Sequence, residues 1–242
     1  MTERADGFQV SFRHSWIGRA LRLFFPYGAL IPRLRGLRPV SDHWGFDRGQ
    51  PVDRYYLDRF IRENGRDVRG RVLEVGAPRY ADAYRAEIAR LDVLDVDSAN
   101  RGATILGDLS DVRTLPNDTF DCILLTQVLQ SLEVPVTGLV NAGRAIRPGG
   151  VLLASVPAIS RIPPEGTGTT WYTSFTEPGV RKLCTTALPG FNVTIKAHGN
   201  LAVATAFLEG RAAEELPQSI LEYRDAEYPI IITIRAERPA AS

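Results

Sequence analysis

The sequence predicts an α/β protein with an open, doubly wound, mostly parallel sheet of seven strands. Three observations favour this class. From residue 67 onward, short β-branched and apolar runs alternate with helical patterns, which is typical of parallel sheets. Two of these runs, 121–126 and 151–157, are almost continuously apolar, as expected of strands covered on both faces. A glycine, Gly76, directly follows the first run, where such sheets open toward a ligand.

The predicted elements follow in order along the chain. A helix is expected from an N-cap at Asp53, through Tyr56 and Phe60, to a stop at Gly65. We expect two parts, a helical cap at 1–66 and a sheet domain at 67–242. The predicted strands are 71–75, 91–97, 103–108, 121–126, 151–157, 191–197 and 229–236, and the predicted helices between them are 79–90, 137–147 and 201–215.

The N-terminal segment has a basic amphipathic pattern. Between residues 12 and 25, apolar side chains fall on one helical stripe, and Pro26 ends the helix. The first forty residues contain seven arginines and two acids. This pattern fits two roles: a lid over the sheet domain, or a helix within residues 12–38 that docks on a membrane surface or a partner protein.

Composition argues against nucleic-acid binding, and the sequence shows no cluster of metal ligands, which leaves metal dependence open. The formal net charge is +1, with 44% hydrophobic and 24% charged residues. Cys122 and Cys184 stand in apolar contexts without metal-ligand spacing, so we expect buried, reduced thiols. No apolar stretch reaches the roughly 18 residues of a membrane span, and no secretory signal is visible, so the expected location is cytoplasmic.

An acid after the second predicted strand points to a ligand that contains adenosine. Asp97 follows Gly76 by 21 residues, a spacing that brings a carboxylate to ribose hydroxyls. Residues 77–80 (APRY), however, replace the glycines that let a backbone approach a diphosphate. S-adenosyl-L-methionine has an adenosine and no phosphate, so it fits this combination. Asp108 is placed to accept from the adenine amino group, with Leu109 beside the ring.

The run from 71 to 157 resembles the class I S-adenosylmethionine-dependent methyltransferases. The matching features are "EVG" at 74–76, "GDL" at 107–109, "LP" at 115–116, "FD" at 120–121 and "RAIRPGG" at 144–150. The resemblance implies a Rossmann-like fold, S-adenosyl-L-methionine as cofactor and methyl transfer as the reaction. The residues it implies around the cofactor are Glu74, Gly76, Asp97, Asp108, Leu109, Thr126 and Gln127.

Two further stretches, 44–61 and 198–216, resemble a bacterial subgroup associated with glycosyltransferases and surface-polysaccharide assembly. This resemblance implies O-methylation of a sugar hydroxyl in a glycan or glycan precursor, and contact with a glycosyltransferase or membrane through residues 12–38. Two alternatives stay open: a methyltransferase of small natural products, and a non-catalytic docking partner of a glycosyltransferase or membrane complex. The missing phosphate loop argues against a nicotinamide-dependent reductase.

The chain departs from the family pattern at the site. The usual E-x-G-x-G-x-G is reduced to one glycine, and the gap from Asp97 to Asp108 leaves room for a loop only. Gln130 stands where the family often has a histidine that could act as a base.

A hydroxyl acceptor benefits from a base that removes its proton. His43 is the predicted base, because it precedes the helix expected to cover the cofactor. His198, Asp53, Tyr55 and Tyr56 are the other candidates, with Asp53 favoured as a helix cap. The predicted acceptor-binding residues are Arg48, Tyr55 and Trp171, the last as a wall for a sugar ring.

Overall fold

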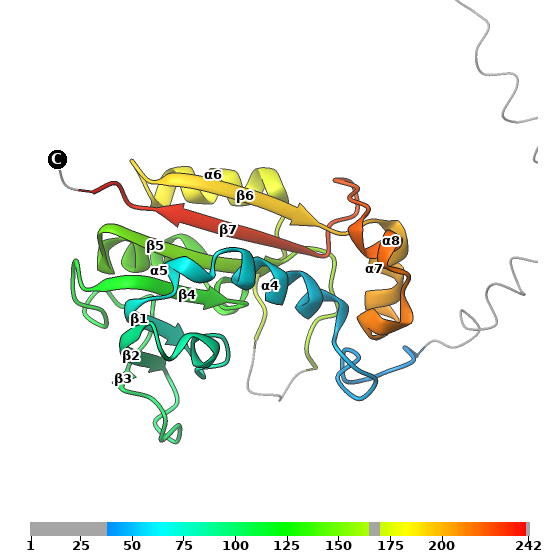
Figure 1. Cartoon of the computed structure of the whole chain (residues 1–242), viewed down its shortest axis with the longest axis horizontal. Helices are drawn as coiled ribbons and strands as arrows, with labels where there is room; N and C mark the ends of the chain where they lie inside the picture. The colour runs from blue at the N-terminus through cyan, green and yellow to red at the C-terminus, as the bar shows by residue number, and fades with distance from the viewer. Residues whose placement is uncertain (1–37, 165–169, 241–242) are drawn as a thin grey trace, which may run out of the picture. The chain divides into compact units, whose positions relative to one another are not determined.

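A seven-stranded sheet in the order β3-β2-β1-β4-β5-β7-β6 forms the centre of the computed structural model (Figure 1). The structure describes residues 38–164 and 170–240, and the chain from Val40 onward folds as one compact unit. Strands β1 to β5 are parallel to one another, whereas β7 runs antiparallel to both β5 and β6. The predicted doubly wound, mostly parallel sheet is confirmed. The predicted helix at 12–25 lies outside the described residues.

The elements have the following bounds. The strands are β1 (Gly70–Val75), β2 (Ile88–Asp95), β3 (Ile105–Leu106), β4 (Phe120–Thr126), β5 (Ile146–Pro157), β6 (Asn192–His198) and β7 (Ile231–Glu237). The helices are α4 (Val52–Glu63), α5 (Pro135–Ala145), α6 (Glu177–Ala187), α7 (Leu201–Leu208) and α8 (Gln218–Glu222). Short 3-10 turns lie at Gly65–Asp67, Ala81–Tyr84, Leu129–Ser131 and Ala213–Glu215.

The central strands are buried on both faces because their side chains alternate between two cores. In β4, Ile123 and Leu125 belong to one hydrophobic cluster, while Cys122 and Leu124 belong to the other. All four side chains are fully buried. This is why the sequence of β4 is a continuous apolar run rather than an alternating one.

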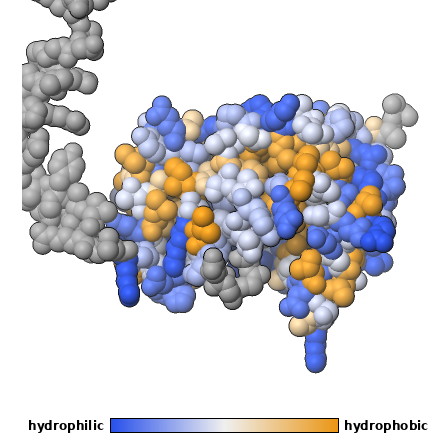
Figure 2. Space-filling view, turned by 180° about the vertical axis from the view of Figure 1, so that it is seen from behind, coloured by the Kyte–Doolittle hydropathy of each residue, from blue (hydrophilic) through white to orange (hydrophobic). Residues whose placement is uncertain are grey.

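Helices cover each face of the sheet. α5 and α6 contribute Leu139 and Val180 to the first cluster, and α4 and α7 contribute Leu57 and Val203 to the second (Figure 1). Seen from behind, hydrophobic and hydrophilic residues are intermixed over the surface (Figure 2). The segment 40–66 lies in the same compact unit as the sheet; a domain boundary at residue 66 stays a prediction.

The thiols of Cys122 and Cys184 are free and buried, as predicted. Burial raises the pKa of both, that of Cys184 to about 11. Both groups are therefore protonated and unreactive at neutral pH.

The predicted helix at 79–90 is wrong. Only a 3-10 turn, Ala81–Tyr84, forms there, and β2 begins at Ile88. The backbone of Ile88 pairs with Gly70, and Tyr84 packs on α4, where its hydroxyl donates to the carbonyl of Ile61 at 3.3 Å. Strand pairing and packing far along the chain thus outweigh the local helical spacing of the sequence.

Other boundaries differ for similar reasons. Helix α4 begins at Val52 with Pro51 as N-cap, so Asp53 lies in its first turn and is not the cap. The sequence Pro148-Gly149-Gly150 lies within β5, and the predicted helix at 201–215 ends as α7 at Leu208. Helix α6 is not among the predicted helices. Thr176 caps it by accepting a hydrogen bond from the Gly179 N–H.

We predict that Asp92 stabilises the edge of the sheet. Its carboxylate is 1% exposed and accepts from Arg71 Nε at 2.7 Å and from Arg90. Burial raises the pKa of Asp92, but the two arginines outweigh it and leave the pKa below 3.8. Asp92→Ala should lower the free energy of unfolding by about 1.5–3 kcal/mol, measured by urea denaturation.

The stabilisation by Asp92 should be present at neutral pH and disappear as the pH falls through its lowered pKa, since protonation removes the charge. The control is Asp82→Ala, which removes an exposed acid 3.7 Å from Arg85 and should change stability by less than about 0.5 kcal/mol. Equal losses in the two variants would contradict a special contribution of Asp92.

Candidate functional site

The carboxyl ends of β1, β2 and β3 are joined into one edge by backbone hydrogen bonds. The Gly76 N–H donates to the Leu94 carbonyl and the Gly107 N–H donates to the Asp95 carbonyl, each at 2.9 Å. Gly76 has φ +85°, and a Cβ there would meet no atom within 4 Å. The end of β1 therefore opens into free space, with acidic side chains on the neighbouring strands.

Two acids stand at the end of β2. The strand ends at Asp95, so Asp97 does not close it as predicted but lies exposed in the following turn. The carboxylate of Asp97 accepts from the Ala99 N–H at 2.8 Å. Asp95 is half-buried, and Asn100 bridges its carboxylate to the Gly76 carbonyl with two 2.7 Å hydrogen bonds. Asp95 is the acid that the backbone fixes next to Gly76.

The pKa of Asp95 lies below its ordinary value. Partial burial raises it, but hydrogen bonds from the Asp97 N–H and from Asn100 lower it further. Asp95 is therefore ionised at neutral pH and acts as a hydrogen-bond acceptor.

Glu74 shapes the loop that replaces the glycine-rich turn. Its carboxylate is 1% exposed and accepts from the N–H groups of Tyr80 and Ala81 at 3.0 and 2.9 Å. Burial raises the pKa of Glu74, and these two hydrogen bonds partly offset that effect. Both carboxylate oxygens are engaged with the backbone, so Glu74 holds the 76–81 loop closed against β1.

Of the two residues predicted to lie beside the adenine, one is exposed to solvent and the other is buried in the core. Asp108 is exposed, and its carboxylate accepts from the Ser110 N–H at 2.7 Å. Leu109 is buried in the first hydrophobic cluster. The loop 96–104 between β2 and β3 contains no helix, as predicted.

Gln127 follows β4 in a strained conformation. Its φ is +57°, which is uncommon for a residue other than glycine. The Gln127 N–H donates to the carbonyl of Ser155, at 3.0 Å, and so locks the end of β4 to β5 beyond Thr126. The buried Gln130 amide donates to the Gln127 carbonyl at 2.8 Å, while its own Oε1 has no hydrogen-bond partner. Two amide side chains are thus held at the end of β4.

An aromatic cavity of about 380 Å³ lies beyond the ends of β4 and β5. We call it the first cavity. Gln127 and Gln130 lie on its wall, opposite the apolar surfaces supplied by separate segments of the chain. The residues that line it are Trp44, Phe46, Asp53, Arg54, Gln127, Gln130, Pro157, Ser160, Pro163, Trp171, Phe207 and Ile230.

Asp53 is the carboxylate among the described residues that line the first cavity. Its side chain is 14% exposed, and Arg54 Nε lies 3.6 Å from its Oδ2. Burial raises the pKa of Asp53, and the charge of Arg54 only partly offsets that. A partly desolvated carboxylate with a raised pKa has the property of a general base, so Asp53 is a functional candidate.

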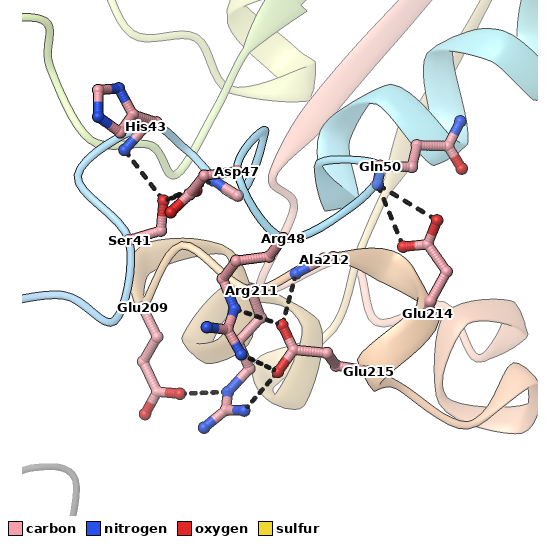
Figure 3. Close-up of polar contacts among 11 residues, drawn as sticks. Ser41, His43, Asp47, Arg48, Gln50, Glu209, Arg211, Ala212, Glu214 and Glu215 are labelled. Carbon is pink, nitrogen blue, oxygen red and sulfur yellow. Dashed lines mark hydrogen bonds and ion pairs between the residues drawn. The ribbon is translucent and has the colours of Figure 1, made fainter.

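Trp44 and Phe46, which line the cavity, belong to a turn at 41–50. Polar contacts fasten this turn to residues 209–215 (Figure 3). Arg48 donates to both carboxylate oxygens of Glu215, at 2.7 and 2.8 Å. The Gln50 N–H donates to Glu214, and the Ala213 N–H donates to the Gln50 carbonyl. We call this set of contacts the clamp; it positions the aromatic turn over the first cavity.

Several predicted site residues lie elsewhere. His43 is exposed and lines neither this cavity nor the second one described below. Arg48 is engaged by Glu215, and the Tyr55 hydroxyl donates to Glu222 at 2.9 Å. Trp171 is the one predicted acceptor-binding residue that lines the first cavity.

His198 lies away from the first cavity. It stacks on Tyr56, with ring centroids 5.4 Å apart, and its Nε2 lies 2.9 Å from the Thr233 hydroxyl. Burial lowers the pKa of His198 to about 4, so the ring is neutral at physiological pH. These contacts indicate that His198 has a packing role at the end of β6.

Two classes of site have no support in the part of the chain that the structure describes. Residues 38–164 and 170–240 contain no group of three or more His, Cys, Asp or Glu side chains able to hold a metal ion. Within the same ranges, no helix is long and apolar enough to cross a membrane.

Comparison with known families identifies the sheet edge described above. Residues 69–154, which run from β1 to the middle of β5, match a family model described as a methyltransferase domain. The chain is therefore similar to methyltransferases over this region, and the match supports S-adenosyl-L-methionine as cofactor. No curated protein sequence matches the chain.

Solved structures share the fold of this region. A SAM-dependent methyltransferase from Archaeoglobus fulgidus matches with a TM-score of 0.52 at 13% identity, covering 76% of this chain and 94% of that one. One from Mesorhizobium loti matches with 0.52 at 16% identity, covering 77% and 98%. The chain has the class I methyltransferase fold, as predicted.

The [4+2]-cyclase SpnF also matches, with a TM-score of 0.52 at 16% identity, covering 93% of this chain and 96% of that one. A protein described as a cyclase therefore shares this architecture. The fold alone does not specify the reaction, which has to be argued from the residues of the site.

The strand edge fits the cofactor. The end of β1 is open above Gly76, so a ligand can lie against the backbone there. Carboxylates such as those at the ends of β2 and β3 can accept hydrogen bonds from hydroxyl and amino groups of the kind that an adenosine carries. No phosphate has to be accommodated, which agrees with a loop that has lost its glycines.

We predict that the clamp controls the first cavity. Gly210 has φ +74°, and a Cβ there would lie 2.5 Å from the Ser41 carbonyl oxygen. Gly210→Ala should force the 41–50 turn away from 209–215 and lower the melting temperature. Fluorescence of Trp44, measured in a Trp16→Phe/Trp171→Phe background that leaves it as the single tryptophan, should shift to longer wavelength.

The matched control is Gly190→Ala. Gly190 has φ +80°, and a Cβ there would meet nothing within 4 Å. Gly190→Ala therefore shares with Gly210→Ala the backbone strain of about 1 kcal/mol but not the steric clash. If both variants lose stability equally and the tryptophan emission does not move, the close approach at Gly210 is not what holds the turn.

Proposed function

We propose that the chain transfers a methyl group from S-adenosyl-L-methionine to a hydroxyl of a sugar, in a glycan or a glycan precursor. The observation that carries this proposal is Asp53, a carboxylate with a raised pKa in an aromatic cavity at the ends of β4 and β5. Trp44 and Trp171 supply flat apolar surfaces of the kind on which sugar rings stack. The resemblance to glycosyltransferase-associated methyltransferases supports the same class of acceptor.

In this proposal the cofactor lies along the carboxyl edge of β1 to β4. Asp95 and Asp97 stand where ribose hydroxyls are bound in folds of this kind, and Asp108 stands toward the adenine. Gln127 lines the first cavity and directly follows Thr126, so it marks the junction between the cofactor edge and the acceptor. When bound, S-adenosyl-L-methionine supplies an electrophilic methyl group on its sulfonium.

The chain's own residues have three tasks. Trp44, Phe46 and Trp171 exclude water from the acceptor and orient its ring. The side-chain amide of Gln127, on the wall of the first cavity, meets a second hydroxyl of the acceptor. Asp53 accepts the proton of the attacking hydroxyl, and a pKa raised by burial makes it a stronger base than an exposed aspartate.

A non-catalytic docking role is the second candidate, because Glu74 is fully engaged with backbone N–H groups and Asp97 and Asp108 cap their own turns. Cofactor binding and methyl transfer separate the two roles. A small natural-product acceptor would be distinguished by an acceptor screen. Contact with a glycosyltransferase or membrane through residues 12–38 stays a prediction.

The first test concerns cofactor binding. Asp95→Ala should weaken the binding of S-adenosylhomocysteine by about 1.5–3 kcal/mol, because a charged acceptor for the ribose is lost. Isothermal titration calorimetry measures this directly. Asp97→Ala, which removes an exposed acid two residues on, is the comparison. If only Asp97→Ala weakens the binding of S-adenosylhomocysteine, Asp97 binds the ribose, as the sequence spacing predicts.

The second test concerns the base. Asp53→Asn should reduce kcat on a sugar acceptor by about 10²–10⁴-fold while leaving S-adenosylhomocysteine affinity unchanged. The rate of the unmodified chain should rise with pH through the raised pKa of Asp53, because only the ionised form accepts a proton. Full activity in Asp53→Asn would exclude Asp53 as the base. Asp82→Asn, which changes an exposed acid, is the control and should retain full activity.

Asp53→Asn should also change stability in a pH-dependent way. The folded state raises the pKa of Asp53 above 3.8, so ionisation weakens folding as the pH rises through that window. The variant lacks the charge and should melt at a higher temperature than the unmodified chain at pH 8, with the difference shrinking toward pH 4.

A further inference from the structure

A second cavity, of about 560 Å³, lies between α4 and the 3-10 turn Ala81–Tyr84. We infer that it is a binding site for a phosphate group, formed by Arg54, Arg62, Arg79 and the Tyr80 hydroxyl. It occupies the side of the sheet where the sequence predicts a full helix at 79–90 and the structure has a single turn.

The charges on the walls of the second cavity are mainly positive. Arg54, Arg62 and Arg79 line it, and Asp58 is the acid among its lining residues. The carboxylate of Asp58 already accepts from the Gln50 side chain at 2.6 Å. The balance among the lining residues is therefore about two positive charges; Arg54 also faces Asp53, so Arg62 and Arg79 are the charges left for a phosphate group.

The guanidinium groups are available to a ligand. Among the described residues, no carboxylate lies within ion-pair distance of Arg62 or Arg79. Arg79 lies over the ring of Phe46, 5.7 Å from its centroid, so a face of the guanidinium is in contact and its N–H edge stays free. Arg54 is 3.6 Å from Asp53, beyond a normal hydrogen bond.

Tyr80 gives an independent sign of a ligand. Tyr80 lines the cavity and is 8% exposed, and its buried hydroxyl has no hydrogen-bond partner of proper geometry. Burial raises the pKa of this hydroxyl, Arg54 lowers it through its charge and its N–H groups, and the charge of Asp58 raises it. A buried O–H donor without an acceptor, in a cavity that Arg62 and Arg79 also line, is suited to a phosphate oxygen.

The second cavity adjoins the first, because Phe46 and Arg54 line both. A ligand that places a hydroxyl near Asp53 can therefore reach Arg62 and Arg79 with a phosphate attached to the same molecule. The acceptor class that fits both cavities is a phosphorylated sugar. This link rests on the proposed function, whereas the phosphate site itself does not.

The test is calorimetric titration of the full-length chain with inorganic phosphate, against chloride at equal ionic strength. The double variant Arg62→Gln/Arg79→Gln should bind phosphate at least tenfold more weakly, and Tyr80→Phe about five- to tenfold more weakly. Arg66→Gln is the matched control, since it removes one exposed charge outside the cavity and should leave phosphate affinity unchanged. No phosphate binding, or equal losses in Arg66→Gln and the double variant, would overturn the site.

A second arm identifies the source of the phosphate. A hexose 1-phosphate should bind at least tenfold more tightly than either inorganic phosphate or the unphosphorylated hexose, and Trp171→Ala should remove that gain. Equal affinity for hexose 1-phosphate and inorganic phosphate would overturn the link to the acceptor. The double variant should bind S-adenosylhomocysteine with unchanged affinity. If the unmodified chain binds phosphate but does not bind S-adenosylhomocysteine, the proposed function fails and the phosphate site stands.

Discussion

The burial of β4 and β5 on both faces is the constraint on which the rest of the structure depends. Successive side chains of β4 enter opposite hydrophobic clusters, so neither face of the strand is available to a ligand. Helices α4 and α7 on one side, and α5 and α6 on the other, are needed to cover it. What remains open is the carboxyl edge, where Gly76 and the first cavity both lie.

The edge is built from backbone contacts, whereas the first cavity depends on contacts between distant parts of the chain. Gly76, Asp95 and Gly107 are fixed by hydrogen bonds between neighbouring strands. The aromatic turn at 41–50 is held in place by residues 209–215, through ion pairs and close backbone approaches. Replacing these loop contacts would alter the first cavity without changing the sheet. Changes of this kind are one physical route by which a single fold serves different reactions.

Asp53 illustrates how position changes chemistry. In the sequence it has the features of a helix cap, which would use its carboxylate on backbone N–H groups. In the structure Pro51 takes the cap position, so the carboxylate is left beside Arg54 in an aromatic cavity, where burial raises its pKa. A shift of two residues in the start of α4 therefore converts a structural side chain into a candidate base.

The sequence by itself determined the sheet, because apolar runs, glycines and turn residues act over a few neighbouring positions. It located the ends of β1 and β4, and hence Gly76 and Gln127, and it indicated the methyltransferase class from motifs that lie in order between 71 and 157. Only the tertiary structure decided that residues 79–90 form a turn and a strand, that Asp95 rather than Asp97 closes β2, and that Trp44, Asp53 and Trp171 share one cavity. These outcomes depend on pairing and packing between segments far apart in the chain, and local spacing carries no information about such contacts.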